Sequence, residues 1–260
     1  MVLRALFFFD NFDSAKMMHH CGAIVKAIVD PLTCCDVWTI PVDALANREV
    51  AFFQSFMSTA KTAVVLGHHV VTEEEWAWYA TENGGEHCAA DDHAKAVCKD
   101  LQRALEANGF PTEVVPYPRE SGLQFRFVAQ AAGAGGIGTN AFLLHPEWGP
   151  WIHLRVLATE GPSRSKVGGN SAHVCDACGA CIAACPAGAI QDAMFDGLLC
   201  RRYRGAQGEY TPVGPQRELR YCTICAHSCP IGQRPKPREG TDKQPPEPGK
   251  KREKGTDFDR

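Results

Sequence analysis

The chain carries four cysteines between residues 175 and 185, and a proline follows the last of them. Their order is Cys175, Cys178, Cys181, Cys185 and Pro186, which gives the spacing C-x2-C-x2-C-x3-C-P. Thiolates at this spacing hold a cubane iron–sulfur cluster, in which three of them bind one cluster and the fourth binds a neighbouring cluster. The run therefore predicts a second set of cysteines elsewhere in the chain.

That second set follows the first. Cys222, Cys225, Cys229 and Pro230 repeat the C-x2-C-x3-C-P ending, and Cys200 precedes them across an insertion. A zinc site is the alternative for paired C-x2-C, but zinc does not explain an ending that occurs twice. Proteins with two such runs ligate their clusters crosswise, so each run gives one cysteine to the other cluster. The crossed pattern predicts two 4Fe-4S clusters, one held by Cys175, Cys178, Cys181 and Cys229 and the other by Cys200, Cys222, Cys225 and Cys185.

The N-terminal sequence and the cysteine content favour a reducing compartment. The apolar run from Ala5 to Phe9 is shorter than the ~7–15 residues that a secretory signal needs. No stretch approaches the ~18 apolar residues that span a bilayer. We therefore expect a cytoplasmic protein, in which clustered cysteines are metal ligands or redox groups and not disulfides. A hydrophobic share of 45% and a formal charge of -3 indicate neither a membrane nor a nucleic-acid partner.

The segment before the cysteines alternates between strand and helix patterns. Residues 62–71 and 151–160 are strand-like, residues 14–29 look helical, and apolar residues from Ala94 to Leu105 recur at helical spacing. The residues from Arg234 onward have too few apolar side chains to pack. These patterns predict an α/β (α+β) fold in three parts. The parts are a pocket-forming domain over 1–165, a ferredoxin-type domain with two clusters over 166–233, and a disordered tail over 234–260.

A glycine-rich segment lies between the helical pattern and the cysteines. Gly133, Gly135 and Gly138 match G-x-G-x-x-G, the fingerprint of dinucleotide-binding folds. That fingerprint follows a strand and opens a helix. Here the segment follows an alanine-rich helical pattern and leads to Pro146 and Pro150, which forbid a long helix. Nicotinamide binding is therefore not expected at these glycines.

The same segment carries a family resemblance. The stretch AAGAGGIGTNAFLLHPEWGPWIHLRVLATE, followed by the two cysteine runs, resembles the core of the epoxyqueuosine reductase and reductive dehalogenase superfamily. Members share a helix, a turn of the form G-x-G-x-I-G-x-N, an apolar strand, a turn with proline and glycine, and a second strand that leads to the clusters. The match covers about residues 60–232. Its matching positions are Gly133, Gly135, Ile137, Gly138, Asn140, Leu143, Leu144, Pro146, Gly149 and Thr159.

The resemblance implies a fold and a chemistry. It implies a cobalamin-binding domain related to the nitroreductase fold, to which two 4Fe-4S clusters relay electrons. It implies a proton-donating carboxylate just before the glycine turn, where this chain offers Glu120 and not the aspartate of epoxyqueuosine reductases. A low-potential ferredoxin or flavodoxin would donate the electrons. The residues implied to approach the cobalamin are Gly133, Gly135, Gly138 and Asn140.

Two functions fit these patterns, and both need the eight thiolates. In the first, the chain is a cytoplasmic reductase of the epoxyqueuosine reductase kind, acting on a small molecule or a modified base. In the second, it is a ferredoxin-like electron-transfer module that reduces a partner enzyme or a corrinoid protein and has no substrate of its own. The helical region with which epoxyqueuosine reductases grip transfer RNA has no counterpart after the cysteine runs, so a nucleic-acid partner is not expected.

The remaining cysteines and the histidines have no ligand spacing. Free cysteine commonly behaves as a small buried apolar residue, and we expect Cys98 to pack on its helix. His145 lies beside tryptophans in the Pro146 turn and is interpreted as a packing residue, with an acid-base role as the alternative. His68 and His69 give still weaker signals. The cysteines outside the two runs are Cys21, Cys34, Cys35, Cys88 and Cys98.

Overall fold

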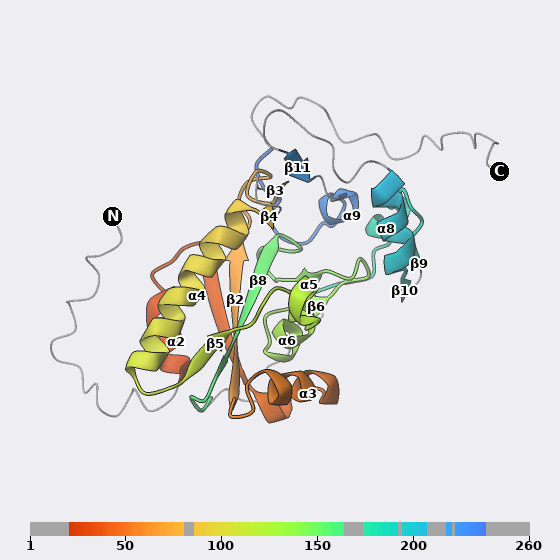
Figure 1. Ribbon diagram of the computed structural model, residues 1–260. Coiled ribbons are helices and arrows are strands. Elements are labelled where there is room, and N and C mark those ends of the chain that lie inside the picture. The colour runs from red at the N-terminus through yellow and green to blue at the C-terminus, as the bar shows by residue number, and fades with distance from the viewer. Residues whose placement is uncertain are drawn as a thin grey trace.

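The computed structural model describes residues 21–80, 86–163, 174–191, 194–206, 217–219 and 222–237. Its centre is a sheet whose strands, in spatial order, are β1 (Cys35–Pro41), β2 (Thr62–His69), β8 (Ile152–Thr159) and β5 (Thr112–Val114). Neighbouring strands are antiparallel (Figure 1). β2 and β8 are buried along almost their whole length. This burial explains the nearly continuous apolar runs from which the sequence predicts both strands.

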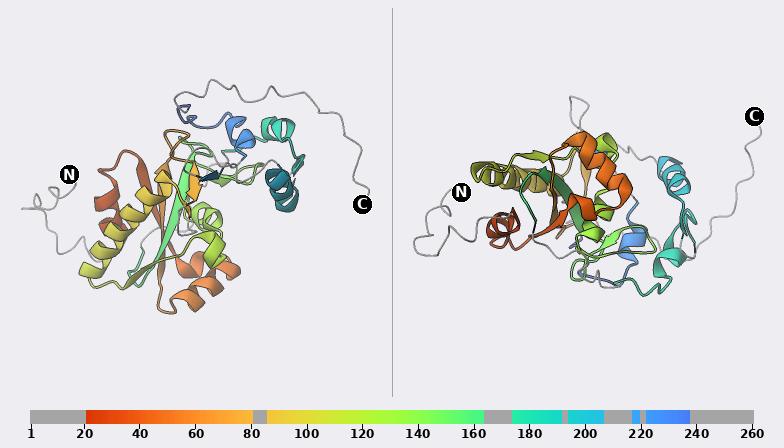
Figure 2. Two further views of the ribbon diagram at one scale, coloured as in Figure 1. Left: turned by 45° about the horizontal axis from the view of Figure 1, so that its top comes forward. Right: turned by 90° about the horizontal axis from the view of Figure 1, so that it is seen from below.

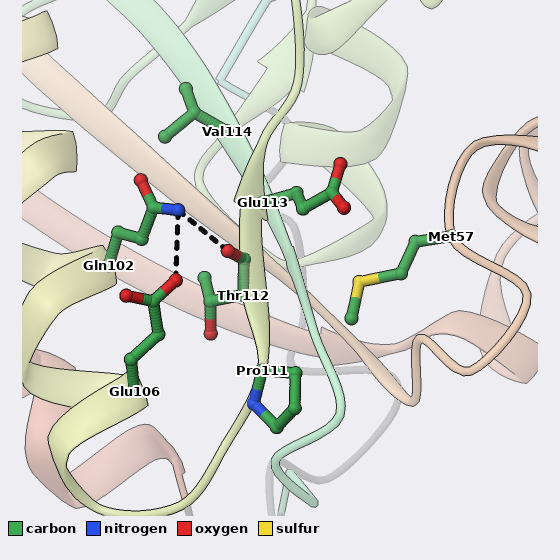
Figure 3. Close-up of a pocket in the computed structure, with 7 residues that line it drawn as sticks. All are labelled: Met57, Gln102, Glu106, Pro111, Thr112, Glu113 and Val114. Carbon is green, nitrogen blue, oxygen red and sulfur yellow. Dashed lines mark hydrogen bonds between the residues drawn. The ribbon is translucent and has the colours of Figure 1, made fainter.

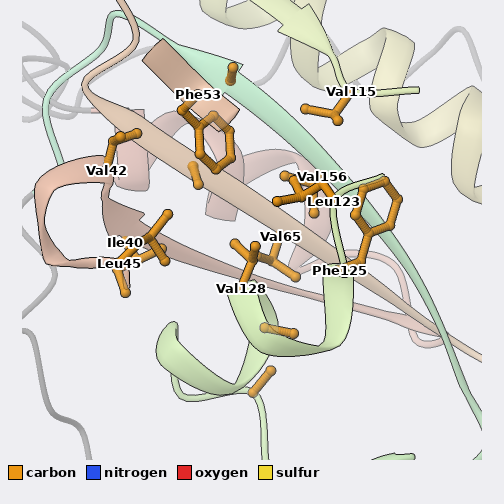
Figure 4. Packing of buried hydrophobic residues seen from close by; sticks show 14 of the residues in the cluster. Ile40, Val42, Leu45, Phe53, Val65, Val115, Leu123, Phe125, Val128 and Val156 are labelled. Carbon is orange, nitrogen blue, oxygen red and sulfur yellow. The ribbon is translucent and has the colours of Figure 1, made fainter. Parts of the chain in front are cut away.

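Helices cover both faces of the sheet in the described part of the chain: α2 (Cys21–Val29), α3 (Asn47–Phe56), α4 (Ala89–Ala107) and α6 (Phe125–Ala131). α2 and α4 pack on one face, and α3 and α6 pack on the other (Figures 1 and 2). Successive side chains of a strand point to opposite faces, so β2 sends Val64 to the first layer and Val65 to the second. Figure 4 shows the second layer, where Phe53 of α3 and Val128 of α6 meet the strands.

α4 follows the predicted helical pattern. Cys98, Leu101 and Leu105 are fully buried between α2 and the sheet, and Cys98 packs as expected. Gly109 has a φ of +80°, a backbone conformation that glycine adopts without strain, and the helix ends just before it. The helix predicted over residues 14–29 is observed from Cys21 as α2, and its first part lies outside the described residues. The architecture is thus a mixed α/β fold, as predicted.

Short elements complete the sheet domain and build a smaller part around the cysteine runs. Within the sheet domain they are η1 (Val42–Ala44), β3 (Trp78–Ala80), β4 (Glu86–His87), α5 (Pro118–Ser121), β6 (Gly136–Ile137) and β7 (Leu143–Leu144). The elements of the cysteine-containing part are α7 (Ala180–Ala184), β9 (Ile190–Gln191), β10 (Met194–Phe195), α8 (Gly197–Ala206), β11 (Arg217–Leu219) and α9 (Ile224–His227).

Backbone contacts tie the cysteine-containing part to the sheet domain. β11 pairs with β3, and the amide of Gln233 donates to the Glu147 carbonyl over 3.1 Å. Gly149 and Gly232 meet backbone to backbone, so that a Cβ on either would collide with main-chain atoms of the other segment. This approach is open to glycine because it has no side chain. The boundary predicted between residues 165 and 166 lies outside the described residues and stays a prediction.

The chain keeps its contacts beyond Arg234, where the sequence predicts that a disordered tail begins. The Lys236 amide donates to the Val71 carbonyl over 2.8 Å, and the Lys236 carbonyl accepts the Glu73 amide over 3.1 Å. Pro235 is buried. The structured part therefore extends past the predicted start of the tail, because backbone pairing does not require the apolar side chains on which that prediction depends.

The two ends of the chain, which support some of the sequence-based expectations, lie outside the described part. These are residues 1–20, from which the compartment is argued, and residues 238–260, the remainder of the predicted tail. Among the described helices, none is both long enough and apolar enough to cross a bilayer.

Candidate metal centre

The first cysteine run lies on a loop that leads into α7. Cys175, Cys178 and Cys181 line one small cavity, and Cys229 of the second run lines it as well. Burial raises the pKa of Cys181, and the charges of the other three cysteines raise it further, because the four sulfurs are neighbours. The protein's thirteen cysteines are all free thiols. The structure thus brings together the cysteines that the crossed pattern assigns to one cluster.

The backbone of the loop is bent sharply. Ala177 has a φ of +55° and Gly179 a φ of +77°, both in the left-handed region. The Cys178 amide donates to the Asp176 side chain over 3.1 Å, which fixes the bend between them. A left-handed residue other than glycine costs about 1–3 kcal/mol and persists where the surroundings hold it, often at a functional site. The bend lets three cysteines spaced by two residues face one cavity.

The glycine turn of the sheet domain touches this cavity. The Thr139 hydroxyl oxygen lies 3.5 Å from Cys175 Sγ, and Thr139 and Asn140 line the cavity with the cysteines. Burial raises the pKa of Cys175, but hydrogen bonds from the side chain and amide of Thr139 and from the Ala177 amide outweigh it and keep the pKa below its ordinary value. A donor to a ligand sulfur tunes the metal group that the sulfur binds.

The remaining four run cysteines form a second group. Cys225 lies in α9, Cys200 in α8, and Cys185 at the end of α7. Burial raises the pKa of Cys225 to about 12, and the charges of Cys222, Cys185, Cys200 and Cys181 act in the same direction. Cys222, Cys185 and Cys200 belong to the second predicted cluster, and Cys181 belongs to the first. The two groups are therefore adjacent.

The donor sets suit iron–sulfur clusters. Each group has four sulfur ligands, and each combines cysteines of both runs. At Cys181 and Cys225, burial and the charges of neighbouring cysteines raise the pKa and oppose ionisation, and bound metal cations would remove that opposition. Zinc also accepts four sulfurs, but zinc sites do not require two runs to exchange one ligand each. The residues present therefore fit two 4Fe-4S clusters.

The glycines of the turn pack against protein atoms. A Cβ on Gly135 would collide with the Leu144 carbonyl oxygen, and a Cβ on Gly138 would lie 2.6 Å from the Leu144 side chain. Gly133, with a φ of +88°, follows the end of α6. Asn140 is buried and its side-chain oxygen accepts a backbone amide of the same turn over 3.2 Å. These four residues shape the β6–β7 hairpin, and their contact with a cofactor stays a prediction.

The cavity between the turn and the cysteines measures about 20 Å³, whereas pockets for large ligands measure ~300–1,000 Å³. This cavity is the one that the first cysteine group lines, and cobalamin binding by the sheet domain stays a prediction.

Glu120 and His145 occupy different environments. Glu120 lies in α5 with its side chain exposed, and its amide donates to the Tyr117 carbonyl over 2.8 Å. His145 is buried, its ring stacks on Trp148 at 4.2 Å, and its Nδ1 accepts the amides of Glu147 and Trp148. Burial lowers the pKa of His145. The His145 ring therefore holds the turn together.

A buried polar cluster that the sequence does not predict lies at the start of α4. Asp91 accepts hydrogen bonds from His153 Nε2 over 2.8 Å and Arg155 Nε over 2.7 Å, and Lys95 Nζ lies 2.7 Å away. Burial raises the pKa of Asp91, but hydrogen bonds from His153, Lys95 and Arg155 outweigh it and hold the pKa well below its ordinary value. Burial lowers the pKa of His153. The cluster joins α4 to β8.

Known proteins share sequence and fold with this chain, although no protein-family model matches it. An epoxyqueuosine reductase of Gloeobacter violaceus is 30% identical over 146 residues, which cover 52% of this chain and 44% of that protein. An epoxyqueuosine reductase of Listeria monocytogenes is 35% identical over 111 residues, which cover 41% of this chain and 29% of that protein. The match thus spans less than half the length of these curated relatives.

Solved structures extend the likeness to the fold. An epoxyqueuosine reductase from Bacillus subtilis superposes with a TM-score of 0.56 at 17% identity, over 79% of this chain and 63% of its own. An epoxyqueuosine reductase bound to a tRNA stem loop gives 0.55 at 17% identity, over 81% and 64%. A catabolic reductive dehalogenase gives 0.50 at 17% identity, over 69% and 28%. The chain therefore shares part of its sequence with epoxyqueuosine reductases, and its fold is similar to those of epoxyqueuosine reductases and of a reductive dehalogenase.

A shallow groove in the described part of the chain lies away from the cysteines. It runs along edge strand β5, where Gln102 Nε2 donates to Glu106 over 3.0 Å and to the Thr112 carbonyl over 2.8 Å (Figure 3). Figure 1 places β5 at the end of the sheet opposite the cysteine-containing part. The residues that line the groove are Met57, Gln102, Glu106, Pro111, Thr112, Glu113 and Val114.

Proposed function

We propose that this chain is an iron–sulfur reductase of the epoxyqueuosine reductase kind, in which two 4Fe-4S clusters carry electrons toward the sheet domain. The observation that carries the proposal is the crossed grouping of the run cysteines. Cys229 of the second run shares a cavity with three cysteines of the first run, and Cys185 of the first run lies with the group around Cys225. Such clusters supply single electrons at low potential.

The path of the electrons follows from what touches each group. Thr139 and Asn140 of the sheet domain line the cavity of the first group, so the first cluster is the one that faces the acceptor. The second group includes Cys200 of α8. Electrons would therefore enter at the second cluster and leave through the first, toward an acceptor bound at the sheet domain.

An exposed apolar surface beside Cys200 suits the electron donor. Met194 and Leu198 are 73% and 53% exposed, and Phe195 and Leu199 join them. Arg201 and Arg202 follow directly and are exposed as well. Apolar side chains beside positive charge favour an acidic protein that docks briefly. The proposed donor is a small acidic low-potential electron carrier, a ferredoxin or a flavodoxin.

The two functions that the sequence allows differ in which molecule accepts the electrons. In the reductase, cobalamin would serve as the one-electron carrier to a small molecule or modified base, and Glu120 would donate the proton. The second function needs no corrinoid of its own, because the chain would be an electron-transfer module that reduces a partner enzyme or corrinoid protein. The sheet domain would then be the surface on which the partner docks.

A cobalamin titration distinguishes these two functions. For the reductase we expect saturable binding of cobalamin to the anaerobic protein with its clusters, followed by oxidation of the pre-reduced clusters. Replacing Glu120 by glutamine should leave the binding unchanged and slow turnover, because the amide cannot donate the proton. Absence of saturable binding, with clusters that still reduce a partner protein, would establish the electron-transfer function.

The Thr139 hydroxyl should raise the reduction potential of the first cluster. Reduction adds negative charge to the cluster, and a hydrogen bond to a ligand sulfur stabilises that charge. We therefore expect the substitution Thr139→Val to make the potential of one cluster more negative, while Thr139→Ser, which keeps a hydroxyl, stays near the wild-type value. A redox titration followed by electron paramagnetic resonance measures both potentials. An unchanged potential in Thr139→Val would show that the hydroxyl does not donate to Cys175.

A further inference from the structure

Two cysteines outside the cluster runs lie beside two histidines at one end of the central sheet. Cys34 precedes β1 and Cys35 begins it, and Cys35 pairs in register with His68 of β2. His93 lies in the second turn of α4, which packs on the same face of the sheet as the side chain of Cys35 (Figure 1). Three elements that are distant in sequence thus deliver two sulfurs and two imidazoles to one place.

Three of the distances among these side chains are close to those of a tetrahedral metal site. The sulfurs of Cys34 and Cys35 are 3.9 Å apart, Cys35 Sγ lies 3.6 Å from His68 Nδ1, and Cys34 Sγ lies 4.0 Å from His93 Nδ1. Zinc binds sulfur at ~2.3 Å and nitrogen at ~2.0 Å, so its tetrahedral ligand atoms stand about 3.4–3.8 Å from one another. Each of the three observed separations lies within this range or exceeds it by only a few tenths of an ångström.

The histidine rings are oriented to approach the sulfurs from two sides. The rings of His68 and His93 are 4.7 Å apart at their centroids and nearly perpendicular, at 81°. The ligand atoms of Cys34, Cys35 and His68 all lie within 4.8 Å of one another. Cys35 and His68 are buried, whereas His93 is exposed and lies on the solvent side of the site. An ion could therefore reach the site without opening the core.

The donor set selects the kind of ion. Two thiolates and two neutral imidazoles give a mixed sulfur and nitrogen set, which zinc prefers in tetrahedral geometry. Cys34 and Cys35 are separate from both cluster groups, which contain only cysteines of the two runs.

We propose that Cys34, Cys35, His68 and His93 form a structural zinc site that ties the start of β1, the end of β2 and the N-terminal turns of α4 together. Four protein ligands leave no open position for substrate or water, which is the mark of a structural and not a catalytic zinc. The ion would also fix the part of α4 from which Asp91 reaches Arg155 and His153. This proposal stands independently of the clusters and of the proposed function.

Zinc analysis and X-ray absorption at the zinc edge test the proposal on the full chain with its iron–sulfur clusters assembled. We expect about one zinc ion per chain, bound by two sulfurs at ~2.3 Å and two nitrogens at ~2.0 Å. The zinc edge is separate from that of iron, so the clusters do not obscure the signal. Zinc bound by four sulfurs, or no zinc together with a disulfide between Cys34 and Cys35 in the mass spectrum, would overturn the proposal.

Variants assign the ion to these residues. Cys34→Ser should lose the zinc, and His93→Ala should weaken zinc affinity by at least ~10-fold, since even outer-shell changes cost that much. His93 is exposed, so its removal leaves the core intact and tests the site if Cys34→Ser does not fold. Two controls should keep the zinc: Cys98→Ala, in the same buried layer but outside the site, and Cys178→Ser, in the first cluster group. Zinc retained in His93→Ala at wild-type affinity, or lost in Cys178→Ser, would contradict the assignment.

Discussion

Replacing Cys175 and Cys229 together by alanine is expected to remove no more iron than replacing either one alone, about four ions per chain. Both cysteines line the same cavity, so in the crossed arrangement they serve the same cluster and its loss is complete after the first substitution. Alanine is used because serine can replace a thiolate as an oxygen ligand. Iron per folded chain, measured after anaerobic cluster assembly, gives the result directly.

A second double variant, with Cys175 and Cys185 both replaced by alanine, is expected to lose more iron than either single variant. Cys175 and Cys185 belong to the same run but to different groups, so replacing both should remove about eight iron ions. If each run held its own cluster, the results would be exchanged: the pair from one run would lose half of the iron, and the Cys175 and Cys229 pair would lose all of it. The variant Cys98→Ala, at a buried cysteine outside both groups, should keep all of the iron.

The second large effect concerns stability. Asp91→Ala is expected to lower the free energy of unfolding by ~3–5 kcal/mol, because it leaves the buried Arg155 guanidinium without its carboxylate partner. The side chains of Asp91 and Arg155 are 1% and 5% exposed. The neighbouring Asp92 is 52% exposed, and its carboxylate lies 3.3 Å from the exposed ring of His87. Asp92→Ala is therefore the matched control and should change stability by less than ~1 kcal/mol. Denaturant unfolding compares the two, and equal effects would show that the buried cluster does not hold α4 to β8.

The same cluster gives stability an acid dependence. The pKa of Asp91 is held below its ordinary value in the folded state, while in the unfolded chain it returns to ~3.9. The stability that this group contributes is therefore fully present above that unfolded value, and it is lost as the pH falls toward the folded pKa. Below about pH 4, wild-type stability should consequently fall more steeply with pH than that of Asp91→Asn.

The local patterns of the sequence predict the elements that are long and strongly periodic. The apolar spacing from Ala94 to Leu105 gives α4, and the apolar run after Thr62 gives β2, because both signals lie within one segment. The strand β1 and helix α3 are not predicted. β1 pairs with β2 along its whole length, so its stability depends on contacts distant in sequence.

The candidate sites divide in the same way. The cysteine runs are predictable because ligand spacing within one loop is a local property. The Asp91 cluster is not, since its partners in β8 are 62 and 64 residues away in sequence. Cys35 and His68 are likewise brought together only by the register of β1 and β2. The glycines are ambiguous from sequence alone, because close packing of two strands demands glycine as strongly as a ligand does.

Counting iron and acid-labile sulfide in the anaerobically assembled full chain tests the central claim most directly. Two cubane clusters require about eight iron and about eight sulfide ions per chain, with about one zinc ion in addition at the site of Cys34, Cys35, His68 and His93. Zinc in place of iron at the two run-cysteine groups, without sulfide, would contradict the account.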